Sequence, residues 1–188
     1  MTKMLASTRK AAIPFLLLAV SLVVFPFTVS AVDSNVGIVT LNASVQDSIS
    51  VSLGVGTVNF SLLPGAAVTG TPTVPITTSW NLKPAGGPIV SLYAYFDSST
   101  VALTDGTDNI PSADVQGYIN SVGPTNFTQT GAFGAPGASL LLFSEAISGA
   151  NKVKTRNDTL DVRIDLTTLP LLPAGTYTGT MRIQAQAL

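Results

Sequence analysis

The chain has 188 residues, with nine basic and ten acidic side chains and with neither cysteine nor histidine. Without these two residue types it has no Ser–His or Cys–His nucleophile pair, no disulfide and no usual set of zinc ligands. It is weakly acidic and has no basic run, so the electrostatic footprint that nucleic acids and anionic lipids require is missing. We therefore expect a non-enzymatic protein without catalytic, cofactor-binding or metal-binding residues and without a nucleic-acid partner.

Residues 1–31 have the layout of a secretory signal peptide, which we expect as a helix preceding the folded domain. A basic start is followed by the apolar stretch "AAIPFLLLAVSLVVFPF" and then by "TVSA", whose small residues place cleavage after Ala31. An uncleaved membrane anchor is the alternative, because the apolar stretch is long for a signal. Pro14 and Pro26 interrupt that stretch and no basic stop-transfer cluster follows it, which favours cleavage.

Cleavage would leave residues 32–188 as a single domain, with six basic and ten acidic side chains and a net charge of about −4. The signal peptide predicts a protein that is secreted, periplasmic or displayed at the cell surface. The membrane would be a partner only during export.

Nearly every readable segment of residues 32–188 alternates apolar and polar side chains with period two, as half-buried strands do. In chain order, the expected strands are residues 39–45, 49–55, 57–62, 74–82, 89–96, 139–143, 161–166 and 176–187. Clusters of Gly, Pro, Asn and Asp separate them, and only "SADVQGYINS" could form a short helical turn. These about eight strands predict an all-β domain, an antiparallel sandwich of two sheets, with Trp80 in its core.

The last expected strand, residues 176–187, alternates most regularly. The side chains expected to face the core are Tyr177, Met181, Ile183 and Ala185, and those expected to face solvent or a partner are Thr178, Thr180, Arg182, Gln184 and Gln186. A shift by one residue would bury Arg182 and expose Ile183, so the pattern specifies the register of this strand.

Two sets of residues support a second interpretation, a secreted carbohydrate-binding module that could depend on calcium. Asp105 and Asp108 in "DGTDN", with Asp97 and Asp114 nearby in the chain, supply oxygen ligands of the kind that calcium prefers, although Asp is also an ordinary turn residue. Tyr93, Tyr95, Tyr118 and Phe127 could form an aromatic platform for a sugar. The long segment 117–138 is either a surface loop or a crossover between sheets, and loops of this length often carry function.

The two ends of the domain show a more specific pattern. "LPAGTYTGTMRIQAQAL" and "VTLNASVQDSISVSLGVGTVNF" resemble the ends of the spore-coat-U and archaic chaperone–usher pilin domains. Pro173, Ala174, Gly175 and Tyr177 match the opening of that family's last strand, and Phe60 matches its early aromatic residue. The resemblance implies an immunoglobulin-like sandwich with an exposed edge, completed by a strand from another copy or from a periplasmic chaperone.

The resemblance favours an exported structural or adhesive subunit assembled by β-strand addition over the carbohydrate-binding alternative. If residues 39–45 form the first strand, "VDSNV" before them is too short for an ordinary donor segment. The sandwich would then be a tip-like subunit or complete on its own, and the sequence leaves both open.

Overall fold

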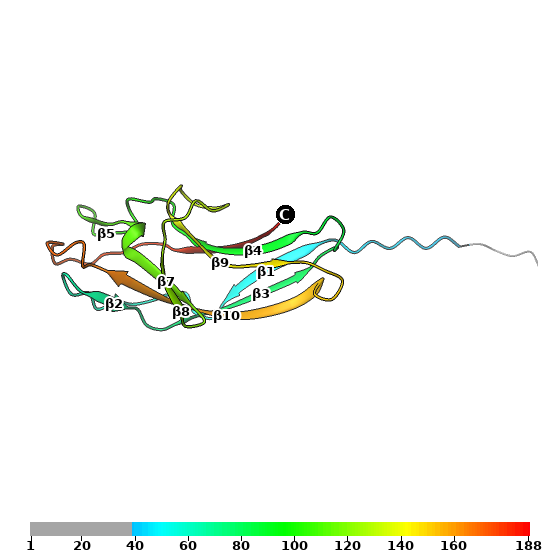
Figure 1. The fold of residues 1–188 in the computed structure, drawn as a ribbon, viewed down its shortest axis with the longest axis horizontal. Helices are drawn as coiled ribbons and strands as arrows, with labels where there is room; N and C mark the ends of the chain where they lie inside the picture. Colours follow the sequence, from blue (N-terminus) through cyan, green and yellow to red (C-terminus); the bar gives the residue numbers. More distant parts are fainter. Residues whose placement is uncertain (1–38) are drawn as a thin grey trace, which may run out of the picture. The chain divides into compact units, whose positions relative to one another are not determined.

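The computed structural model describes residues 39–188, and the expected signal peptide lies outside these residues. Ala43–Leu188 forms one compact unit. This unit is built from antiparallel strands, as the period-two pattern predicts (Figure 1). Within residues 39–188, no helix has the length and apolar character needed to cross a membrane.

The larger sheet has the strand order β1-β3-β10-β7-β8, and β2 also pairs with β10. Its strands are β1 (Ser48–Leu53), β2 (Ala67–Thr69), β3 (Val74–Asn81), β7 (Val115–Ile119), β8 (Val122–Asn126) and β10 (Val153–Asp165). The long β10, drawn in orange, pairs with β3 along its first half and with β7 along its second half (Figure 1). Because β1 and β8 lie at the ends of this order, the sheet is open at both edges.

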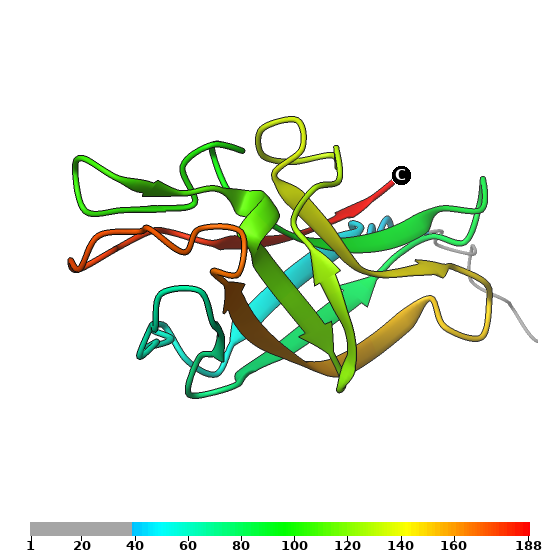
Figure 2. The same ribbon diagram turned by 60° about the vertical axis from the view of Figure 1, so that its left-hand side comes forward.

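The second sheet has the order β11-β4-β9, with β4 (Ile89–Tyr95) between β9 (Ser139–Ala146) and β11 (Arg182–Ala187). A small hairpin joins β5 (Leu103–Thr104) to β6 (Asn109–Ile110), and the 3₁₀ turn Ser112–Asp114 leads into β7. Figure 2 shows β11, in red, and the residues before it running on one side of β4, with the β5–β6 hairpin near their start.

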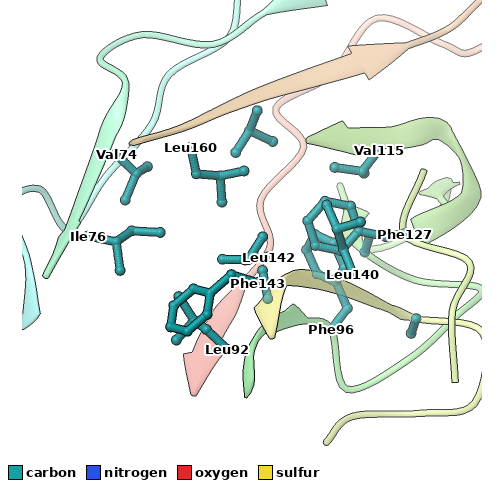
Figure 3. Close-up of a cluster of buried hydrophobic side chains, with 14 of the residues drawn as sticks. Val74, Ile76, Leu92, Phe96, Val115, Phe127, Leu140, Leu142, Phe143 and Leu160 are labelled. Atoms are coloured by element: carbon teal, nitrogen blue, oxygen red, sulfur yellow. The ribbon is translucent and has the colours of Figure 1, made fainter. Parts of the chain in front are cut away.

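The inward side chains of the two sheets form a single hydrophobic core. Val74, Ile76 and Leu160 come from the larger sheet, and Leu92, Leu140, Leu142 and Phe143 come from the smaller one (Figure 3). Every second residue of β3 is buried, including Trp80, which confirms the predicted inward face of this strand.

The last strand has the predicted register but begins later than predicted. β11 starts at Arg182, whereas residues 176–181 make one isolated bridge, between Thr178 and Thr104. Tyr177, Met181, Ile183 and Ala185 pack against the core, and Thr178, Thr180, Arg182 and Gln184 are exposed, while Gln186 is half-buried. Gly179 lies so close to the Ala102 carbonyl that a Cβ atom would come within 1.9 Å of its oxygen.

Two predicted strands are absent from the structure and one predicted turn is mostly strand. Residues 39–45 form no strand, and residues 57–62 contain only the isolated bridge between Asn59 and Thr71. "SADVQGYINS" gives a 3₁₀ turn of three residues and then β7, whose Gly117 leaves space for the Leu140 and Leu160 side chains. Segment 117–138 is therefore not one loop, since it begins with the β7–β8 hairpin.

Ion pairs connect β9 to β10. Glu145 accepts a hydrogen bond from Lys154 Nζ at 2.6 Å and lies 3.7 Å from Arg156, which binds Asp158 at 2.7 Å. Arg156 also lies over the Phe143 ring, 4.3 Å from its centroid. Burial alone would raise the pKa of Asp158, but hydrogen bonds from Arg156 and Asn120 outweigh it and lower the pKa below its ordinary value of 3.8.

We expect Asp158→Asn to lower the free energy of unfolding at neutral pH by about 2 kcal/mol, because it removes the carboxylate closest to the Arg156 guanidinium and leaves only the more distant Glu145. A carboxyl with a lowered folded-state pKa stabilises the fold above its unfolded pKa and stops doing so as the pH falls through the folded pKa. The difference between variant and wild type, measured by urea unfolding, should therefore shrink below pH 3.8.

Asp97→Asn is the matched control for this prediction. Asp97 is paired with Arg182 at 3.1 Å, but both side chains are more than half exposed, so its loss should cost less than about 0.5 kcal/mol. Equal effects of the two substitutions would contradict a structural role for the Asp158 pair.

Candidate functional site

An apolar groove of about 800 Å³ lies between an early and a late segment of the domain. Residues 53–64, which begin at the end of β1, form one wall, and residues 172–183, which lead into β11, form the other. The core side chains at its base are Val74, Phe96, Val115, Val162, Ile164 and Leu166. None of the lining residues carries a charge.

The groove continues between β1 and β11 as a smaller cleft of about 270 Å³, lined by residues 49–51 and 183–185. Each of these strands is hydrogen-bonded on one side only, β1 to β3 and β11 to β4, since both lie at the ends of their sheets. Within residues 39–188, no strand pairs with the edge that either of them turns toward the groove.

The backbone geometry shows which groups line the free edge of β11. Leu188 exchanges both hydrogen bonds with Ile89, and Thr178 exchanges both with Thr104. Because successive residues of a strand direct their N–H and C=O groups to opposite edges, the even-numbered residues of this segment face β4 and β5. The odd-numbered residues from Tyr177 to Ala187 therefore present their backbone groups to the groove side.

Side chains along both walls are only partly buried. The half-buried apolar residues packed against the core include Ile49, Val51, Val55, Val58, Phe60, Leu62, Leu172, Tyr177, Met181 and Ile183, and they lie mainly along the two walls. The base of the groove differs, because Ile164 and Leu166 are almost completely buried. The walls are therefore in contact with the core on one side and open on the other, as expected where an adjacent strand is missing.

The expected acidic cluster is not assembled in the described part of the chain. Asp105 Oδ1 accepts the backbone N–H groups of Thr107 and Asp108 at 2.9 and 2.8 Å, which closes a turn and lowers the pKa of Asp105. Asp97 pairs with Arg182, and Asp114 accepts a hydrogen bond from Thr168. No group of three or more acidic side chains lies close enough to hold a metal ion within residues 39–188.

The four aromatic residues considered as a sugar platform are not arranged as one surface. Phe127 is completely buried, with its ring centroid 5.1 Å from that of Phe96. Tyr95 stacks under Phe133 at 5.8 Å and donates a hydrogen bond to Gln184 at 2.9 Å. The part of the expectation that needs Phe127 to be accessible is therefore wrong.

Sequence reasoning placed the inward residues of both walls but not the groove between them. Alternation along residues 49–62 and 176–187 correctly predicts most of the side chains that point inward, with the exception of Leu53, which is exposed. Alternation contains no information about which strands are neighbours. No protein-family model, no curated protein and no solved structure matches this chain.

Proposed function

We propose that this chain is an exported, non-enzymatic structural or adhesive subunit of the cell surface that is completed by β-strand addition. The observation that carries the proposal is the apolar groove between residues 53–64 and 172–183, together with the cleft between the unpaired edges of β1 and β11. Two unpaired edges beside open apolar side chains are an aggregation hazard unless a strand covers them. Strand addition satisfies the edge through backbone hydrogen bonds and buries alternate side chains at the same time.

The proposed fold is an immunoglobulin-like sandwich that lacks one strand. Support for this fold comes from the antiparallel sheets and the shared core. The non-enzymatic role is supported by the lack of histidine and cysteine in the sequence. During export, the groove would be covered by another copy of the chain or by a periplasmic chaperone that supplies a strand. Secretion itself is supported by the layout of residues 1–31.

We expect Leu53→Lys to abolish assembly, because it places a charged side chain in the wall of an uncharged groove. Leu53 is 44% exposed, so the isolated domain should remain folded. Val153→Lys is the matched control, since Val153 is 62% exposed and does not line the groove. Light scattering over a range of concentrations, with electron microscopy of the product, measures the assembly.

Hydrogen exchange gives an independent measurement of strand addition at the free edge of β11. The amides of Ile183, Ala185 and Ala187 should exchange rapidly in the monomer and become protected on assembly, because they face the free edge. A wild-type protein that stays monomeric at every concentration would contradict strand addition. A hydrolytic activity lost on replacing one carboxylate would contradict the non-enzymatic assignment.

A further inference from the structure

The turn that connects β9 to β10 brings an amine, an amide and a carboxylate together. Glu145 Oε1 accepts a hydrogen bond from Lys154 Nζ at 2.6 Å and another from Asn151 Nδ2 at 2.8 Å. The lysine amine and the asparagine amide are therefore neighbours on one carboxylate oxygen. The Glu145 side chain is only 18% exposed, and Lys154 Nζ lies over the ring of the buried Trp80, 5.8 Å from its centroid.

The side-chain carbonyl of Asn151 is held by two hydrogen-bond donors. Its Oδ1 accepts the backbone N–H of Ser148 at 2.6 Å and the Ser148 hydroxyl at 3.1 Å. Two donors on one carbonyl oxygen stabilise the negative charge that forms there when a nucleophile attacks the carbon. The backbone carbonyl of Asn151 also accepts a hydrogen bond from Trp80 Nε1 at 2.9 Å, which fixes the turn against the core. The amide carbon of Asn151 is thus held in place and activated toward a nucleophile.

Glu145 is placed to move the protons that such an attack requires. A lysine amine is protonated at neutral pH and becomes a nucleophile only after it loses a proton to a base. The hydrogen bond from Lys154 lowers the pKa of Glu145 below its ordinary value of 4.5, so Glu145 is a carboxylate that is able to accept a proton. Because the same oxygen contacts Asn151 Nδ2, the proton can pass to the nitrogen that leaves.

We propose that Lys154 and Asn151 become joined by an intramolecular amide bond, with Glu145 as the proton carrier. Lys154 Nζ forms a bond to Asn151 Cγ, and the electron pair of the carbonyl moves to Oδ1, where Ser148 holds it. The carbonyl then re-forms and the bond from Cγ to Nδ2 breaks. Nζ loses two protons through Glu145: the first passes to water before the attack, and the second passes to Nδ2, which leaves as ammonia. The reaction occurs once and consumes the residues that it joins, so the chain is still not an enzyme.

Such a bond closes the connection between the two sheets covalently. Asn151 lies in the turn and Lys154 near the start of β10, three residues later, a spacing that a link between the two side chains can span. The chain has no cysteine, so an exported domain of this kind has no disulfide to provide a cross-link. A cross-link stabilises a fold by restricting the unfolded chain, and a short closed loop such as this one contributes less than a long one.

The mass of the intact protein tests the proposal. The full-length chain is expressed with its export signal and recovered after export, and its N-terminus is read by mass spectrometry. The denatured wild type should be lighter than its sequence by one molecule of ammonia. Lys154→Arg keeps the positive charge beside Glu145 but has no nucleophilic amine, so it should have its full mass. Glu145→Gln, which has no base, should also have its full mass. Lys152→Arg is the matched control, since Lys152 makes no contact with Glu145, and it should lose ammonia as the wild type does.

A digest with trypsin and chymotrypsin identifies the bond. Trypsin cleaves after a free lysine, so the wild type should resist cleavage after Lys154, and the fragment with Asn151 should stay joined to the fragment with Lys154. A succinimide at Asn151 gives the same loss of ammonia, but it leaves Lys154 cleavable and persists in Lys154→Arg, and that result would overturn the proposal. A wild type with its full mass would overturn it too, whether or not the variants fold. Neither result would affect the proposed function, because strand addition does not require this bond.

Discussion

Truncating Phe127 to alanine should lower the free energy of unfolding by about 3–5 kcal/mol, the usual cost of removing a fully buried aromatic ring. Phe127 is 0% exposed, packs on Phe96 and holds the end of β8 against β7, where its backbone N–H binds the Val115 carbonyl at 3.0 Å. No water can fill the resulting apolar cavity at low cost. Urea unfolding followed by fluorescence measures the change.

Phe133→Ala is the matched control, because Phe133 is also aromatic but lies on the outer side of Tyr93 and Tyr95 and is only half-buried. We expect Phe133→Ala to lower the free energy of unfolding by about 1 kcal/mol. If Phe127→Ala cost less than Phe133→Ala, the buried position of Phe127 would be wrong, and its interpretation as a surface platform would have to be reconsidered.

The buried position of Phe127 could not be predicted from its neighbours in the chain. The stretch "NSVGPTNFTQTGAFGAPGAS" has no period of two, and its glycines and prolines are typical of a loop. The structure nevertheless forms β8 there, because the β7–β8 hairpin is stabilised by its contacts with the rest of the sheet. A side chain at position 117 in β7 would collide with the Leu140 and Leu160 side chains, so glycine is required there by tertiary packing.

The central strands β3 and β4 were predicted well, whereas β7 and the first half of β10, which also have partners on both sides, were not. For β4, alternation correctly places Val90, Leu92 and Ala94 in the core, where they are completely buried between β9 and β11. Alternation reports the pattern of side chains that a strand would bury, and for a central strand the fold supplies both neighbours.

The period-two pattern wrongly predicted a strand over residues 39–45, and this error has a physical cause. The alternation of Val39, Leu41 and Val45 is as regular as that of β4, yet these residues pair with no strand within residues 39–188. A period of two indicates that a segment is able to form a strand, whereas a strand also requires hydrogen-bonding partners.

The free edge of β11 leads to the last prediction. Ile183→Asp should lower the free energy of unfolding by at least about 3 kcal/mol at neutral pH, since it removes an apolar side chain from the core and places a carboxylate there. Ile183 pairs with Ala94 in the sheet, packs against the core and lines the groove, so the substitution should also prevent strand addition. Unfolding in urea and light scattering measure the two effects.

Gln184→Asp, one residue later, is the control that tests the register. Gln184 is exposed and accepts one hydrogen bond from Tyr95, so its replacement should cost about 1 kcal/mol or less. The introduced carboxyl at 183 should have a raised pKa, because burial disfavours its charged form. A raised folded-state pKa means that protonation favours the native state, so Ile183→Asp should regain part of its lost stability as the pH falls toward 4, whereas Gln184→Asp should not. Equal costs for the two substitutions, or no recovery at low pH, would show that Ile183 does not face the core, and the free edge inferred for β11 would then lie on the wrong residues.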